Sequence, residues 1–123
     1  MPDRENFPAL FARLKAIIEP LALGRLVQAD TADHYVVAAH PSPKYRQYPQ
    51  GIYLAGVQIK KNYVSYYLMP VYAFPELLEG ISEPLKKRMQ GKSCFNFTKI
   101  DEPILDELAR LTTMTVECFQ RDL

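Results

Sequence analysis

The sequence predicts an α+β fold, in which helices cover one face of a curved antiparallel sheet of about five strands. Two observations carry this prediction. Apolar residues recur at three-four spacing in three segments, and β-branched and aromatic residues gather in short runs between them. With 123 residues, 48% hydrophobic and 24% charged, the chain is expected to form one domain, residues 1–123, with its own core.

Three segments have the spacing of amphipathic helices, at the N-terminus, in the centre and at the C-terminus. The first covers residues 7–21. The central one, residues 75–91, is interrupted by Gly80 and Pro84, which predicts one kinked helix or two short ones. The last helix is expected to begin near Asp101.

Five runs between these segments read as short strands. The first two are joined by the turn-rich "DTAD", and "KKN" is the expected hairpin turn between the third and the fourth. Pro70 is expected to limit the fourth strand. The predicted strands are 25–29, 34–40, 52–59, 63–69 and 92–99.

Composition excludes several classes of protein. A net charge of +1 argues against a nucleic-acid binder, and no apolar run is long enough for a membrane span. The N-terminus lacks the apolar core of a signal peptide, so we expect a cytoplasmic protein whose two cysteines are thiols. His34 and His40 lie six apart, which is poor spacing for zinc, so we expect no metal site and no cofactor.

One segment departs from the average composition. Between His34 and Phe74 the chain has no aspartate or glutamate, yet it contains all eight tyrosines and four basic residues. If helices cover one face of the sheet, the other face can present aromatic rings with cations at its rim. Such a surface suits a small anionic or planar ligand, or a protein partner. The predicted site comprises Tyr45, Arg46, Lys60, Lys61, Tyr63, Tyr66 and Tyr67.

A purely structural interpretation of the same segment stays open. Tyrosine packs well on strands, and lysines at a hairpin turn are ordinary solvated residues. Tyr63 and Tyr67 share one face of their strand, while Tyr66 lies on the other, and either face can be the core. A homodimer through this surface is a further alternative.

Cys94 offers an enzymatic alternative. A nucleophilic thiolate needs a partner that lowers its pKa, and Lys92, two residues away, would share its face in a strand. A small thiol on a half-buried strand is more often a packing residue. We therefore expect a protein that is not an enzyme, with a thiol enzyme that uses Cys94 as the third candidate.

Three stretches, "YVSYYLMPVY", "GKSCFNF" and "DEPILDEL", resemble YdhG-like domains of unknown function. The similarity runs from about Tyr53 to Leu111. It implies a curved antiparallel sheet against helices, similar to frataxin, and hence an iron chaperone as the second candidate. It brings no catalytic residues. Frataxin-like iron delivery uses an acidic ridge on the first helix and strand, whereas Arg13 and Lys15 interrupt the carboxylates here.

Overall fold

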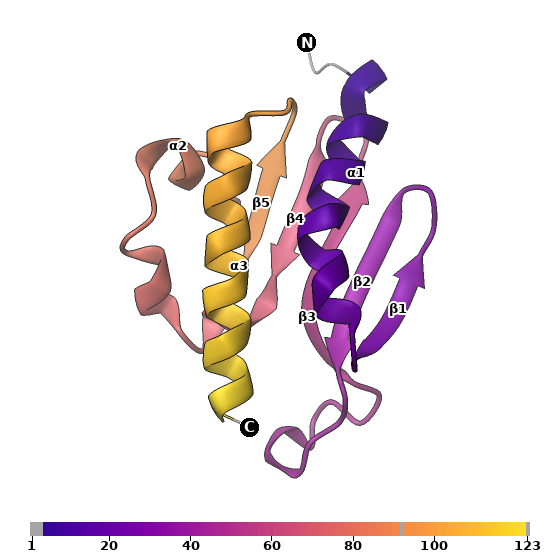
Figure 1. Ribbon diagram of the computed structural model, residues 1–123, viewed down its shortest axis with the longest axis vertical. Coiled ribbons are helices and arrows are strands. Elements are labelled where there is room, and N and C mark those ends of the chain that lie inside the picture. The colour runs from indigo at the N-terminus through magenta and orange to yellow at the C-terminus, as the bar shows by residue number, and fades with distance from the viewer. Residues whose placement is uncertain (1–3, 92, 123) are drawn as a thin grey trace.

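The computed structural model describes residues 4–91 and 93–122, and it has the predicted α+β architecture (Figure 1). The strands are β1 (Leu26–Asp30), β2 (His34–Ala39), β3 (Ile52–Ile59), β4 (Val64–Leu68) and β5 (Cys94–Phe97). The α-helices are α1 (Phe7–Ile18), α2 (Glu83–Lys86) and α3 (Glu102–Asp122).

The five strands form one open antiparallel sheet in the order β1-β2-β3-β4-β5. Each strand pairs with its neighbours in the sequence. The β3–β4 hairpin is closed by the Lys60 N–H, which donates to the Tyr63 carbonyl at 2.8 Å. At the opposite end of the sheet, β2 and β3 are joined by the proline-rich loop, residues 40–51 (Figure 1). The predicted "KKN" hairpin turn between β3 and β4 is therefore confirmed.

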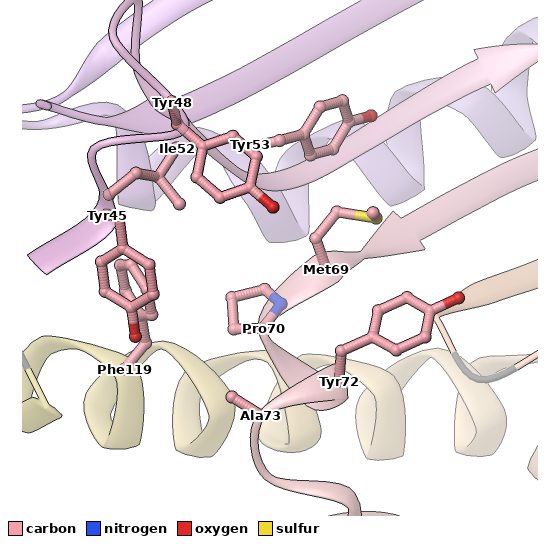
Figure 2. Close-up of a pocket in the computed structure, with 9 residues that line it drawn as sticks. All are labelled: Tyr45, Tyr48, Ile52, Tyr53, Met69, Pro70, Tyr72, Ala73 and Phe119. Atoms are coloured by element: carbon pink, nitrogen blue, oxygen red, sulfur yellow. The ribbon is translucent and has the colours of Figure 1, made fainter.

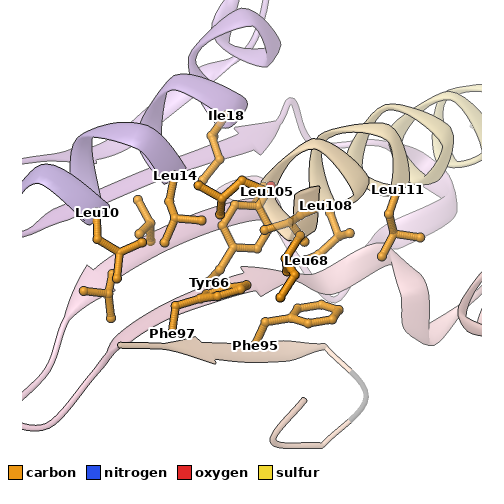
Figure 3. Packing of buried hydrophobic residues seen from close by; sticks show 14 of the residues in the cluster. Leu10, Leu14, Ile18, Tyr66, Leu68, Phe95, Phe97, Leu105, Leu108 and Leu111 are labelled. Carbon is orange, nitrogen blue, oxygen red and sulfur yellow. The ribbon is translucent and has the colours of Figure 1, made fainter. Parts of the chain in front are cut away.

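Helices α1 and α3 lie side by side over one face of the sheet (Figure 1). On α1 the buried residues follow the three-four spacing seen in the sequence, and on α3 they run from Ile104 to Phe119. The sheet residues that pack against these helices are Val64, Tyr66 and Leu68 of β4 and both phenylalanines of β5. Figure 3 shows Tyr66, Leu68, Phe95 and Phe97 pointing from the strands toward the two helices.

The central segment contributes less helix than its spacing predicts. Glu76 and Leu77 belong to a short 3-10 turn, Pro75–Leu78, and the one α-helical turn is α2. Ser82 begins α2, because its hydroxyl accepts the Leu85 N–H at 3.4 Å. The same hydroxyl donates to Glu107 on α3 at 2.5 Å, which ties the segment to the long helix. Two short helical pieces replace one helix, as Gly80 and Pro84 indicate.

Within residues 4–91 and 93–122, no helix covers the second face of the sheet (Figure 1). The register places Gly56 opposite Tyr67 and Ser65 opposite Asn96 on this face, and Cys94 opposite Tyr67. The Ser65 hydroxyl donates to the Asn96 side chain at 2.7 Å. Among the described helices, none is long and apolar enough to cross a membrane.

Candidate functional site

A hollow lined mainly by aromatic side chains lies at the end of the sheet where β2 and β3 are joined. Its volume is about 340 Å³, within the usual range for small-molecule sites. The proline-rich loop, the turn after β4 and the last turns of α3 meet there (Figure 2). We call this hollow the aromatic pocket. It is lined by Tyr45, Tyr48, Ile52, Tyr53, Met69, Pro70, Tyr72, Ala73 and Phe119.

Prolines shape two walls of the aromatic pocket. Pro70 cannot donate to a strand ladder, so β4 ends at Leu68 and the chain turns in a 3-10 helix, Met69–Tyr72. In the loop, Pro43–Tyr45 form a second 3-10 turn, in which the Ser42 hydroxyl accepts the Lys44 N–H at 3.3 Å. The loop turn directs Tyr45 toward Phe119 on α3, and both turns contribute side chains to the pocket lining.

The loop is fastened to α3 by one aromatic and three polar contacts, one of which is the hydrogen bond that Lys44 donates to the Asp122 carbonyl at 2.7 Å. The Tyr45 ring lies against Phe119, with ring centroids 5.5 Å apart. The Tyr45 hydroxyl donates to the Asp122 carboxylate at 2.9 Å, and Lys44 pairs with the other carboxylate oxygen at 2.9 Å. Hydrogen bonds from Lys44 and then Tyr45 hold the pKa of Asp122 below its ordinary value. The Tyr45 wall of the aromatic pocket is thus positioned by four contacts.

The remaining chemistry of the pocket is aromatic and uncharged. No charged side chain belongs to its lining, and the side chains of Tyr48 and Tyr72 are 47% and 59% exposed at its rim. Tyr53 lies half-buried at the strand end of the pocket, with its ring edge-on to Tyr67 at 6.3 Å between centroids. Burial, followed by the neighbouring Tyr67 and Cys94, raises the pKa of Tyr53 well above 10.

Tyr66 corrects the sequence-based site. Its side chain is fully buried beneath the helices, and its hydroxyl lies 2.6 Å from the Thr112 hydroxyl. Because Thr112 itself donates to the Leu108 carbonyl, the tyrosine is the donor in this pair. Alternation along β4 therefore places Tyr66 in the core and Tyr67 on the uncovered face. The inclusion of Tyr66 in a ligand site is wrong.

The other predicted residues do not form one site. Tyr45 lines the aromatic pocket, and Arg46 is exposed on the same loop. Lys60, Lys61 and Tyr63 are exposed at the β3–β4 hairpin, at the far end of β3. An eight-residue strand separates the two groups, roughly 25 Å at about 3.3 Å per residue. The sequence placed them together because a composition window carries no information on strand direction.

Several pocket residues were missed by the sequence analysis. Tyr48, Tyr53 and Tyr72 belong to the acid-free, tyrosine-rich segment, so the compositional signal did contain them. Met69 and Pro70 carry no comparable signal. Phe119 was assigned to the core, and it is 3% exposed, yet its ring also forms the floor beside Tyr45.

Cys94 has the chemistry of a packed thiol. Burial raises its pKa; the Ser65 hydroxyl and the Lys60 charge act in the opposite direction but do not reverse the shift. Lys92, the expected activating neighbour, lies outside the described residues. A raised pKa lowers the thiolate fraction at neutral pH, which is the reverse of what a nucleophile requires.

Two further hollows have no tyrosine or phenylalanine side chain among their described lining residues. One, about 350 Å³, lies between the turn before β1 and the end of α3, where Arg25 donates to the Leu21 carbonyl and to Gln120. The other, about 270 Å³, lies between the central segment and α3. Over residues 4–91 and 93–122, no group of three or more His, Cys, Asp or Glu side chains is arranged to hold a metal ion.

Comparison with known proteins finds no match among protein-family models, curated proteins or solved structures. Membership of the YdhG-like family therefore stays a prediction.

Proposed function

We propose that this protein is a binding domain whose site is the aromatic pocket, and that its ligand is a small, planar and largely apolar molecule. The observation that carries the proposal is the lining: five aromatic rings converge on one hollow of about 340 Å³ with no charged side chain among them. Rings offer faces and edges on which a flat molecule stacks, and tyrosine hydroxyls at the rim supply a few polar contacts.

An anionic ligand is less well supported than a planar one. Lys44, which precedes Tyr45 in the loop, is engaged by Asp122 through its side-chain oxygen at 2.9 Å and through the carbonyl at 2.7 Å. Lys60 and Lys61 are at the opposite end of β3. The pocket lining therefore contains no cation that would bind an anionic ligand, but it does contain the aromatic rings that a planar ligand needs.

The other candidates have weaker support. A thiol enzyme needs a low pKa at Cys94, and the shift runs upward. A frataxin-like iron chaperone needs clustered carboxylates, and on the surface of α1 and α3 Glu102 is instead paired with Arg13. A non-enzymatic accessory domain agrees best with these observations.

Two fluorescent probes test the proposal. N-phenyl-1-naphthylamine is uncharged, and 1-anilinonaphthalene-8-sulfonate adds a sulfonate to a similar ring system. We expect saturable binding of the uncharged probe, at least as tight as that of the sulfonate. Because the chain has no tryptophan, probe emission can be followed without indole interference.

Matched tyrosine variants locate the probe. Tyr48→Ala and Tyr72→Ala each remove an exposed ring at the rim. Each should weaken the affinity for the uncharged probe about threefold to tenfold, which corresponds to the loss of one ring contact. Tyr63→Ala, at the hairpin and 37% exposed, is the control and should leave the affinity unchanged. Non-saturable binding, or equal affinity in all three variants, would contradict the proposal.

A further inference from the structure

We infer that Gly56, which does not line the aromatic pocket, determines which ligands the pocket accepts, because it lets the Tyr53 ring lie along β3 with its hydroxyl pointing away from Tyr45 and Ile52. This inference rests on the proposed function. It concerns a positioning residue: Gly56 acts on the ligand through Tyr53.

A β-bulge brings Tyr53 and Gly56 onto one face. Val37 pairs with Ala55 and the next residue, Ala38, pairs with Tyr53, so Leu54 is an extra residue on β3. In a regular strand, residues three apart point to opposite faces. The bulge adds one residue, so that Tyr53 and Gly56 share the uncovered face.

The Tyr53 ring occupies the space that a side chain at position 56 would need. A Cβ built on Gly56 would lie 2.0 Å from the Tyr53 hydroxyl oxygen and 2.9 Å from the ring carbon that bears it. It would also lie 3.2 Å from the Tyr35 carbonyl oxygen, a tight but smaller conflict. Unlike Gly24, Gly51 and Gly91, Gly56 does not have a positive φ. Glycine is therefore required here for space and not for backbone conformation.

The position of the hydroxyl decides the polarity of this pocket wall. In Figure 2 the Tyr53 hydroxyl points along β3, away from Tyr45 and Ile52, while the ring remains at the pocket. Gly56 is the cross-strand partner of Tyr67, and the Tyr53 ring meets the Tyr67 ring edge-on. The ring is thus fixed between the glycine beneath it and a second aromatic ring beside it.

Any side chain at position 56 must displace the Tyr53 ring, by a tilt within its present rotamer or by a change to another one. A ring that swings toward the pocket fills part of its 340 Å³ and brings a hydroxyl inside. A ring that swings toward solvent removes one wall. Both outcomes disfavour a flat, apolar ligand, so Gly56 contributes to the preference of the site for that class.

The test compares two glycine-to-alanine variants. In Gly56→Ala we expect about a tenfold weaker affinity for N-phenyl-1-naphthylamine and loss of the NMR cross-peaks between the Tyr53 and Tyr67 rings. Gly80→Ala is the matched control, since a Cβ there meets nothing within 4 Å, and it should leave both readouts unchanged. Gly56→Ala with the ring cross-peaks and the affinity intact would overturn the inference.

Removal of the ring completes the cycle. In a Tyr53→Ala background, the added Gly56→Ala change should cost no further affinity. If Gly56→Ala alone folds poorly, the double variant should fold, because the ring that conflicts with the new side chain is gone. An equal loss in that background, or a double variant that still fails to fold, would show that the conflict is with the backbone at Tyr35 and overturn the inference. The ring cross-peaks can be measured without ligand, so they test the role of Gly56 independently of the proposed function. Failure of the wild-type protein to bind the probe would contradict the proposed function alone.

Discussion

Tyr66 and Tyr67 are consecutive residues with opposite surroundings. Tyr66 points into the helix-covered face, is fully buried and donates its hydroxyl to Thr112. Tyr67 points to the uncovered face, remains partly exposed and meets Tyr53 edge-on. The two faces of the sheet therefore use the same residue type for different purposes: one to complete a core, the other to present rings near a pocket.

The largest expected effect comes from truncating the buried member of the pair. Tyr66→Ala should lower the free energy of unfolding by about 3–5 kcal/mol, because it leaves a cavity and removes the donor to Thr112. Tyr67→Ala should cost about 0.5–1.5 kcal/mol, the value of one edge-to-face contact. Urea denaturation of both variants measures the difference. Equal losses would mean that the two faces do not differ as described.

The second prediction concerns stability at alkaline pH. Burial raises the pKa of Tyr66 above the ordinary value of 10, so the folded protein retains a proton that the unfolded chain releases. Stability should therefore fall as pH rises above about 10, by about 1.4 kcal/mol at pH 11 from Tyr66 alone. Tyr66→Phe should reduce this pH dependence. An unchanged slope in the phenylalanine variant would show that the hydroxyl ionises in the folded state.

The smallest expected effect concerns Cys94 on the uncovered face. In a Cys118→Ser variant, iodoacetamide should modify Cys94 more slowly than it modifies free glutathione at pH 8, because burial raises the thiol pKa. The rate should increase as the pH is raised toward that pKa. Faster labelling than glutathione would instead favour the thiol-enzyme alternative.

The elements of the fold could be predicted because their signals are local. The three-four spacing of α1 and α3, the alternation around Phe95 and Phe97, and the strand-limiting Pro70 each act within a few residues. The central segment was harder to predict, since its apolar spacing is helical while Gly80 and Pro84 restrict helix length.

The candidate site could be predicted only in part. The acid-free, tyrosine-rich window does contain Tyr45 and three other pocket tyrosines. Which face Tyr66 occupies depends on where the helices dock, and alternation alone leaves that choice open. The bulge at Leu54, which sets the direction of Tyr53, depends on hydrogen bonds to β2 and has no pattern in the β3 sequence itself.

The order of the sheet also bears on synthesis of the chain. Because each strand after β1 pairs with the strand before it, the sheet can be assembled in the order of synthesis, through short turns between β1 and β2 and between β3 and β4 and through longer connections elsewhere. Helix α1 is made first but packs mainly on β3 and β4, made later. Its apolar stripe therefore stays exposed until those strands are made, and we expect this interval to favour aggregation of the nascent chain.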